Sequence, residues 1–361
     1  MNCRSCKKFL KKPKIIFKDY PISLWPCDKQ LSKKKINMLV YNCQKCSLIQ
    51  LQKFSKKKIS LFYKNESKVL FNKNIIKSRT LSIKENLKNI HNKKALEIGG
   101  GRNMIIHQLK FKEKYLCDFD IINNNSNVKT IKADFNEVKG FKNYFDYIFF
   151  FHTLEHIENP SFFLKNVFNK LKPEGKIILE IPNSKYYQNK IPYYAFFFQH
   201  QTLMSLNSLK NLMMLNNFIF EKKLKTDNSV ILAIFKKKII KNKILIKDKK
   251  ILKHIIINLN KKIFNLKNFI KSKKIKKIAL YGSGGTSMTL HYHLKKNKIL
   301  INSFYDNDIR KINLFIPGTN KKVISGEKFN QNSYDLIVTT NNELKIYLNK
   351  IKINKPIISL E

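Results

Sequence analysis

Between residues 93 and about 236, apolar runs of strand length alternate with stretches of helical spacing. This alternation is typical of a parallel sheet whose strands are joined by crossover helices. A second strand, glycine-rich turn and helix pattern starts at residues 278–282, and no repeat of solenoid length is visible. With 43% apolar residues the chain is too hydrophobic for a disordered polymer. The sequence therefore predicts an α/β protein with two Rossmann-like units.

The 361 residues divide into four parts by composition. We expect a small cysteine-containing module over residues 1–75, a Rossmann-like core over 76–236, a helical linker over 237–274 and a second Rossmann-like domain over 275–361. In the linker Ile and Leu recur with Lys at helical spacing. That pattern fits a connecting helix with a solvated lysine face, or a basic amphipathic helix on a membrane surface.

The formal charge of +48 is carried by 68 lysines and only four arginines. Arginine is the residue that forks phosphates and reads bases, so a nucleic-acid surface should contain more of it. Lys, Asn and Ile are abundant along the whole chain, which is the composition that an A/T-rich genome produces, although a true polyanion-binding surface stays an alternative. We do not expect nucleic acid as a partner.

No run of 18 apolar residues is present, and the N-terminus lacks the apolar segment of a secretory signal. These features predict a cytoplasmic protein without a membrane span. The oligomeric state is not indicated by the sequence.

Five of the six cysteines lie within the first 46 residues, and four of them form two Cys-x-x-Cys pairs: Cys3, Cys6, Cys43 and Cys46. A two-residue spacer lets both sulfurs of a pair turn toward one ion, and four thiolates suit tetrahedral Zn²⁺. Four sulfurs leave no open coordination position, so this Zn²⁺ would be structural. Cys27 has no partner in the pattern, and we interpret it as a buried or free thiol.

Residues 94–103 predict a short strand that runs into a glycine turn and a helix. Glycine allows a ligand to approach the backbone closely, but Met104 occupies the third glycine position of a dinucleotide fingerprint, which disfavours NAD. The next predicted strand ends in acids at Asp118 and Asp120, where a ribose-binding carboxylate belongs. Asp134 ends a third strand and can meet an adenine amino group.

Three blocks together resemble a class I S-adenosylmethionine-dependent methyltransferase over about 150 residues. They are the Glu-x-Gly-x-Gly start at Glu97, the His-x-Leu-Glu-His block at residues 152–156 and the Leu-Lys-Pro-Glu-Gly turn at residues 171–175. By this resemblance Glu97, Gly99 and Gly101 line the methionine end of the cofactor. The same resemblance implies that Asp118, or Asp120, binds the ribose and that Asp134 binds the adenine.

The flanking segments are similar to those of sugar C-methyltransferases that act on nucleotide-linked keto-sugars. Residues 3–6 and 43–51 resemble that family's cysteine motifs, residues 198–206 resemble its Glu-His-Leu-x-Tyr-Phe-Ser block, and residues 281–287 resemble its C-terminal loop. The resemblance implies C-methylation through an enolate, with His200 as the base. Two departures stand out, since the family's glutamate before the histidine is Gln199 here and its C-terminal lysine is Thr286.

The chemistry of such a reaction suits histidine, whose ordinary pKa lies near 6.5. A base must remove the proton next to the ketone, while donors hold the enolate oxygen. His200 is the predicted base and Gln199 its neighbour in the predicted catalytic pair. We interpret His152 and His156 as structural or substrate-lining residues, and Tyr193 and Tyr194 as enolate donors or packing aromatics.

Other functions stay open at this stage. The departures at Gln199 and Thr286 allow a different sugar, or O- or N-methylation of another small molecule. Gly282 and Gly284, followed by Asp306, resemble a degenerate dinucleotide turn and leave an NAD-using half as an alternative to a scaffold that encloses the substrate. A non-catalytic zinc-knuckle RNA-binding protein, or a degenerate scaffold, is the non-enzymatic alternative.

Overall fold

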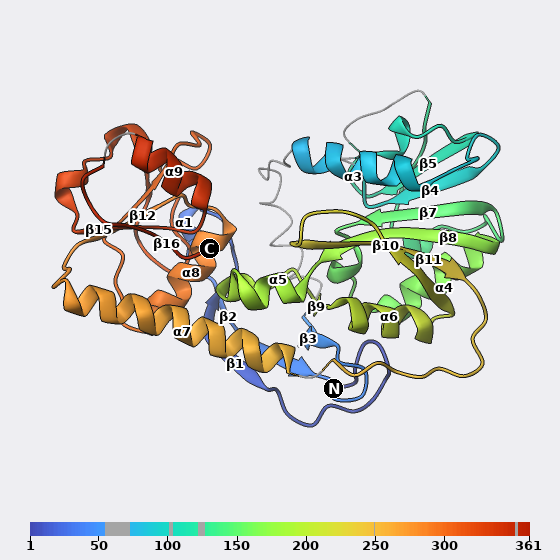
Figure 1. Cartoon of the computed structure of the whole chain (residues 1–361), viewed down its shortest axis with the longest axis horizontal. Helices are drawn as coiled ribbons and strands as arrows, with labels where there is room; N and C mark the ends of the chain where they lie inside the picture. Colours follow the sequence, from blue (N-terminus) through green and yellow to red (C-terminus); the bar gives the residue numbers. More distant parts are fainter. Residues whose placement is uncertain (55–72, 101–103, 122–126, 249, 351–352) are drawn as a thin grey trace.

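A computed structural model describes residues 1–54, 73–100, 104–121, 127–248, 250–350 and 353–361. Three sheets of four, seven and five strands are formed within these residues, and Figure 1 shows them in the order of the chain from blue to red. None of the helices in these ranges is both long and apolar enough to cross a membrane.

The first sheet is antiparallel and has the order β1-β2-β3-β9. Its strands are β1 (Ile15–Pro21), β2 (Lys35–Asn42), β3 (Ile49–Leu51) and β9 (Thr202–Leu203), with the short helix α1 (Lys29–Ser32) between β1 and β2. The fourth strand comes from far along the chain, immediately after His200. The cysteine-containing module and the segment that carries the predicted base therefore share one sheet.

The second sheet has the order β10-β11-β8-β7-β4-β5-β6. Its strands are β4 (Lys94–Ile98), β5 (Glu113–Asp118), β6 (Lys129–Lys132), β7 (Phe145–Phe151), β8 (Leu171–Pro182), β10 (Phe218–Lys223) and β11 (Val230–Lys237). All neighbouring pairs are parallel except the two that involve β11. The strand order reverses between β4 and β7, and in open α/β sheets the ligand crevice lies outside the carboxyl ends of the strands at such a point.

The helices of this part are α3 (Lys73–Asn86), α4 (Pro160–Lys170), α5 (Ser184–Asn189) and α6 (Leu206–Leu215), and the 3₁₀ turns are η2 (Ile106–Gln108), η3 (Phe135–Glu137), η4 (Leu154–His156) and η5 (Pro192–Tyr194). The sequence predicted a helix directly after the glycine turn. In the described residues only the 3₁₀ turn η2 follows it, and the buried carboxylate of Glu97 accepts the backbone amides of Ile105 and Ile106 at its start.

The third sheet is fully parallel, with the order β14-β13-β12-β15-β16. Its elements are β12 (Ile278–Tyr281), α8 (Gly285–Lys296), β13 (Ser303–Asp306), β14 (Val323–Ser325), η6 (Gly326–Lys328), η7 (Gln331–Ser333), β15 (Leu336–Thr339), α9 (Asn342–Lys350) and β16 (Ile357–Ser359). The α/β, Rossmann-like fold class predicted from the sequence is confirmed.

Helix α7 (Ile251–Ser272) occupies the second part of the segment expected to be a helical linker, and residues 238–248 are not helical. Figure 1 shows α7 lying along the C-terminal sheet and reaching α5. Its buried side chains Ile255, Leu259 and Ile263 join a single apolar cluster that also contains residues of the first and third sheets. Burial of this apolar face stabilises the helix.

Candidate active site

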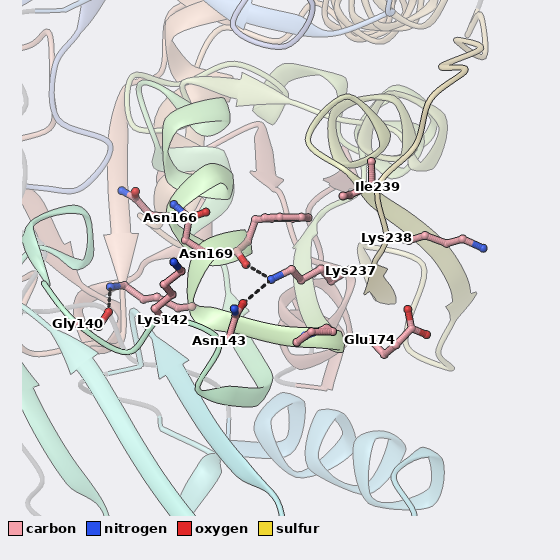
Figure 2. A pocket seen from close by; sticks show the side chains of 12 residues that line it. Gly140, Lys142, Asn143, Asn166, Asn169, Glu174, Lys237, Lys238 and Ile239 are labelled. Atoms are coloured by element: carbon pink, nitrogen blue, oxygen red, sulfur yellow. Dashed lines mark hydrogen bonds between the residues drawn. The ribbon is translucent and has the colours of Figure 1, made fainter.

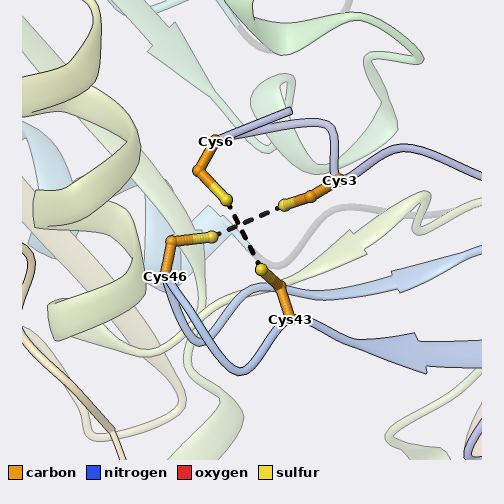
Figure 3. Close-up of side chains that lie close together, drawn as sticks. All are labelled: Cys3, Cys6, Cys43 and Cys46. Carbon is orange, nitrogen blue, oxygen red and sulfur yellow. Dashed lines mark hydrogen bonds between the residues drawn. The ribbon is translucent and has the colours of Figure 1, made fainter. Parts of the chain in front are cut away.

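The four cysteines of the two Cys-x-x-Cys pairs meet at one point, as Figure 3 shows. The Sγ atoms of Cys3 and Cys46 are 3.5 Å apart, those of Cys6 and Cys43 are 3.4 Å apart, and all four lie within 4.8 Å of one another. A disulfide would need about 2.05 Å, whereas tetrahedral Zn–S bonds of about 2.3 Å place the sulfurs about 3.8 Å apart. The cluster is therefore compatible with a Zn²⁺ site.

The two pairs have the same backbone geometry. The amides of Lys7 and Ser47 donate to the carbonyls of Cys3 and Cys43 at 3.1 and 2.8 Å, and both donor residues have positive φ (61° and 63°). This repeated turn aims both sulfurs of each pair inward, which is what the two-residue spacer predicted. Cys27 is buried and lies outside the cluster.

Arg4, inside the first cysteine turn, connects this cluster to the segment that carries His200. Its Nη1 donates to the carbonyls of Leu51 and Gln201 at 2.7 and 2.8 Å, and its Nη2 donates to Gln201 Oε1 at 3.1 Å. On the other side, the buried Asn211 donates to the carbonyl of Cys46 at 3.0 Å. The cysteine cluster is thus bonded directly to the core.

Gly99 follows β4 at the β4/β7 reversal and has φ +78°. A Cβ at this position would lie 2.4 Å from the Oγ1 atom of Thr153, which is the second residue after β7. Thr153 itself donates to the carbonyls of Ile98 and Phe151. Only glycine fits both the backbone conformation and the space here.

Glu97 does not point into open space. Its carboxylate is buried and accepts the backbone amides of Ile105 and Ile106 at 2.9 and 2.8 Å. Burial raises the pKa of Glu97 to about 7, although both backbone hydrogen bonds oppose that shift. The side chain therefore anchors the loop after the glycine turn.

The predicted cofactor-binding acids lie at the same edge of the sheet. Asp118 ends β5, next to β4, and its Oδ1 accepts the amide of Asp120 at 2.9 Å. Asp134 caps η3 and accepts the amide of Asn136 at 2.8 Å. Gly101, the remaining predicted cofactor residue, lies outside the described residues.

A series of charged groups, buried except for the partly exposed His152, lies at the ends of β7 and β8. Arg79 Nε and Nη2 donate to Glu180 Oε1 at 3.1 and 2.5 Å. His152 then contacts both Glu180, through Nε2 at 3.0 Å, and Glu155, through Nδ1 at 3.2 Å. Burial lowers the pKa of His152, but the two carboxylates outweigh it and raise the pKa to about 9.

The predicted base, His200, lies beside the Glu155 end of this series of charged groups. Its ring centroid is 4.0 Å from that of Phe197 and 4.9 Å from that of His156, and its buried Nδ1 has no hydrogen-bond partner among the described residues. Burial lowers the pKa of His200 well below its ordinary value, so the imidazole is neutral at pH 7. One ligand-type atom each of Glu155, His156 and His200 lies within 4.8 Å of the others.

Gln199 is buried, and its side-chain Oε1 has no hydrogen-bond partner in the part of the chain that the structure describes. Its backbone carbonyl accepts from His156 Nδ1 at 3.1 Å, which orients the His156 ring. The buried hydroxyl of Tyr193 likewise has no partner in that part of the chain, while the ring of Tyr194 stacks on Phe197 with centroids 4.7 Å apart.

The glycine turn of the C-terminal sheet faces the same aromatic group. A Cβ at Gly285 would lie 3.2 Å from the Tyr194 hydroxyl and 3.5 Å from the Trp25 ring. Asp306, the acid that a dinucleotide site would use for ribose, is occupied within its own turn. Its Oδ2 accepts from Ser283 N, Ser283 Oγ and Lys311 Nζ at 2.7, 2.8 and 2.9 Å.

A hollow lies at the opposite, amino-terminal edge of the seven-stranded sheet (Figure 2). Lys237 crosses it and donates to Asn143 Oδ1 at 3.1 Å and to the carbonyls of Phe168 and Leu171 at 2.7 and 2.6 Å. Ligands of parallel sheets bind at the carboxyl ends of the strands, so this hollow is not the active site.

Comparison with protein families identifies the core. Residues 73–221 match the model of a methyltransferase domain. This part of the chain is a methyltransferase domain. The match covers the glycine turn, the predicted cofactor acids and His200, and no curated protein matches the chain.

Many solved structures resemble the methyltransferase domain in part. A SAM-dependent methyltransferase from Thermotoga maritima is 19% identical, with a TM-score of 0.37, over 45% of this chain and 89% of its own. One from Mesorhizobium loti is 10% identical, with a TM-score of 0.35, over 44% and 96%. Phosphoethanolamine N-methyltransferase 2 of Haemonchus contortus is 18% identical, with a TM-score of 0.33, over 41% and 39%.

Sequence reasoning missed Arg4, Arg79, Glu155 and Glu180. Glu155 stood inside the His-x-Leu-Glu-His block but was not singled out. The small number of arginines could have pointed to this site. Two of the four, Arg4 and Arg79, are buried and hydrogen-bonded there. In a chain that otherwise uses lysine, a buried arginine marks a position that needs several donors in a fixed plane.

Proposed function

We propose that this methyltransferase acts on a carbon atom next to the ketone of a nucleotide-linked sugar, and that His200 removes the proton from that carbon. The observation that carries the proposal is the position of His200. It is a neutral, partly buried imidazole with an unpartnered nitrogen, in a segment bonded to the cysteine module and packed beside the end of β7.

For the cofactor, we propose that the backbone at Gly99 and Gly101 holds the methionine end of S-adenosylmethionine, that Asp118 binds the ribose and that Asp134 binds the adenine. The glycine turn at Gly99, where Thr153 leaves no room for a side chain, and the shared sheet edge of the two acids support this arrangement. When bound, the cofactor supplies an electrophilic methyl group. Glu97 would act indirectly, by fixing the loop at Ile105 and Ile106.

His200 can accept the α-proton because its ring is neutral at pH 7. The electron pair of the broken C–H bond then resides on the enolate, whose oxygen needs a donor. The buried, unpartnered hydroxyl of Tyr193 is a candidate for that role. The proton on His200 returns to solvent at the end of the cycle.

The remainder of the substrate would lie toward the C-terminal domain. Trp25 and Tyr194 connect the His200 segment to the glycine turn at Gly284 and Gly285. Flat aromatic rings beside glycine backbone suit a base and a phosphate group. We therefore propose that this domain encloses the nucleotide and does not bind NAD, since Asp306 is already fully hydrogen-bonded.

We also propose that Cys3, Cys6, Cys43 and Cys46 hold one structural Zn²⁺. The equal turn geometry of the two pairs and the sulfur separations support this assignment. Such an ion would fix the first sheet, and through it β9 and the position of His200.

The experiment is hydrogen exchange into nucleotide-linked keto-sugars in D₂O, followed by methylation with S-adenosylmethionine, read by mass spectrometry and NMR. Wild type should incorporate deuterium next to the ketone and then add one methyl group at that carbon. His200→Ala should lose both while binding S-adenosylmethionine normally in calorimetry. His254→Ala, an exposed histidine on α7, should behave as wild type.

Methyl addition to oxygen or nitrogen without α-proton exchange would overturn C-methylation and leave an O- or N-methyltransferase. Loss of cofactor binding in Asp118→Ala, with the fold retained, would support the ribose assignment. Unchanged affinity in that variant would contradict it.

A further inference from the structure

Glu155 is a buried carboxylate of which only one oxygen has a partner within the described structure. The residue is 1% exposed, and its Oε2 has no hydrogen-bond partner within the described structure. Leaving a buried polar atom unpaired costs about 1–3 kcal/mol, and more for a charged group. This oxygen is therefore available for a contact that forms when substrate or a proton arrives.

The other carboxylate oxygen of Glu155, Oε1, is held by charged neighbours. It contacts His152, and His152 contacts Glu180, which in turn holds Arg79. With His152 protonated, the group contains two cations and two carboxylates, so its charges are balanced. Three further groups near it are uncharged: His156, His200 and the phenol of Tyr187.

We infer that Glu155 is the positioning residue for His200, supplying the negative charge that Gln199 lacks. This inference rests on the proposed function of His200 as the base. The ligand-type atoms of Glu155 and His200 lie within 4.8 Å, a separation that one bridging water or a small closure of the site spans. When His200 takes a proton, the imidazolium gains a carboxylate neighbour in a setting where charge is poorly solvated.

A metal ion is the competing occupant, since one carboxylate and two histidines can ligate iron or zinc. A resident divalent ion would stand permanently beside the cationic His152, whereas the His200 imidazolium would form only during the reaction. Metal analysis of the purified protein distinguishes the two occupants.

The test compares Glu155→Gln, Glu155→Asp, His200→Ala and the double variant Glu155→Gln/His200→Ala in the deuterium-exchange and methylation assays. Glu158→Gln is the matched control, because Glu158 lies on the same loop, is partly exposed and pairs only with Lys53 among the described residues, at 3.0 Å. Each variant is also checked for cofactor affinity by calorimetry and for metal content by mass spectrometry.

If Glu155 positions His200, Glu155→Gln should lower kcat about 100-fold while KM and cofactor affinity stay within about twofold. Glu155→Asp should recover about tenfold of that loss, since it keeps the charge. The double variant should be no slower than His200→Ala, because residues that act as a unit lose their effect together. A purely structural role would instead give additive losses and no recovery with aspartate.

Full activity of Glu155→Gln, or additive losses in the double variant, would overturn the inference while leaving the proposed function intact. A metal ion beyond the one held by the cysteines, lost in Glu155→Gln, would overturn it in favour of a metal site. If wild type shows no α-proton exchange, the proposed function fails first. In that case NMR titration of His200 decides, since a lower His200 pKa in Glu155→Gln supports the pairing and an unchanged pKa refutes it.

Discussion

The guanidinium of Arg4 is hydrogen-bonded to Gln201, the residue that follows His200, at 2.8 Å to its carbonyl and 3.1 Å to its side chain. Arg4 itself stands between Cys3 and Cys6. A single side chain thus connects the cysteine cluster to the predicted base. The N-terminal module is thus bonded to the segment of the proposed active site and is not an independent appendage.

The first prediction concerns this connection. Arg4→Lys keeps the charge, but a lysine cannot donate hydrogen bonds to Leu51, Gln52 and Gln201 at the same time. We expect a loss of about 2 kcal/mol in the free energy of unfolding and at least a tenfold fall in kcat. Denaturant unfolding and steady-state kinetics measure the two effects. Arg310→Lys, which affects a partly exposed pair with Asp308, should change neither, and equal effects of the two variants would refute the prediction.

The second prediction concerns the proposed Zn²⁺. Cys43→Ser should lower the bound zinc from one ion per chain to a small fraction and should abolish α-proton exchange, because folding of the module is coupled to the metal. Metal analysis and the exchange assay test this. Cys27→Ser, which changes a buried cysteine outside the cluster, should keep its zinc. Zinc-free wild type with full activity would contradict the prediction.

The third prediction separates backbone strain from steric contact in the cofactor crevice. Gly99 and Gly140 have nearly the same φ, +78° and +77°, but an added Cβ meets Thr153 Oγ1 at 2.4 Å in the first case and nothing within 4 Å in the second. Gly140→Ala should therefore cost only about 1 kcal/mol in stability. Gly99→Ala should also weaken cofactor binding more than tenfold in calorimetry. Similar cofactor affinities of the two variants would mean that the crevice is not at Gly99.

The fourth prediction is a pH dependence of stability. The pKa of His152 is raised from 6.5 to about 9 by Glu155 and Glu180, against the effect of burial. The protonated form is thus favoured in the folded state. Its stabilisation is complete below pH 6.5 and is lost as the pH rises through 9. Urea unfolding between pH 6 and 10 should show this decline in wild type and a flatter profile in His152→Gln.

His91→Gln is the control for the fourth prediction, because His91 is exposed and lies in a turn outside the series of charged groups. It should retain the wild-type profile. A decline of the same size in His152→Gln would assign the pH dependence to other groups.

The sequence by itself determined the local elements. Three local patterns could be read from residue types alone: the apolar strands, the glycine turn at Gly99 and the paired cysteines. Because few other structures fit these patterns, the α/β fold and the methyltransferase domain could be recognised. It also placed Asp118 and Asp134 at strand ends, because parallel strands share one carboxyl edge.

The tertiary structure alone decided which distant groups meet. Arg79 and Glu180 are separated by a long stretch of chain, and nothing local requires their pairing; both become buried at one sheet edge and must satisfy each other's charge. Strand β9 joins the N-terminal sheet for a similar reason, because β3 would otherwise expose an unpaired edge. Glu155 gained its proposed role only when folding placed it beside His152, His156 and His200. Long-range pairing of buried polar groups has no sequence period, and for that reason only the folded chain reveals it.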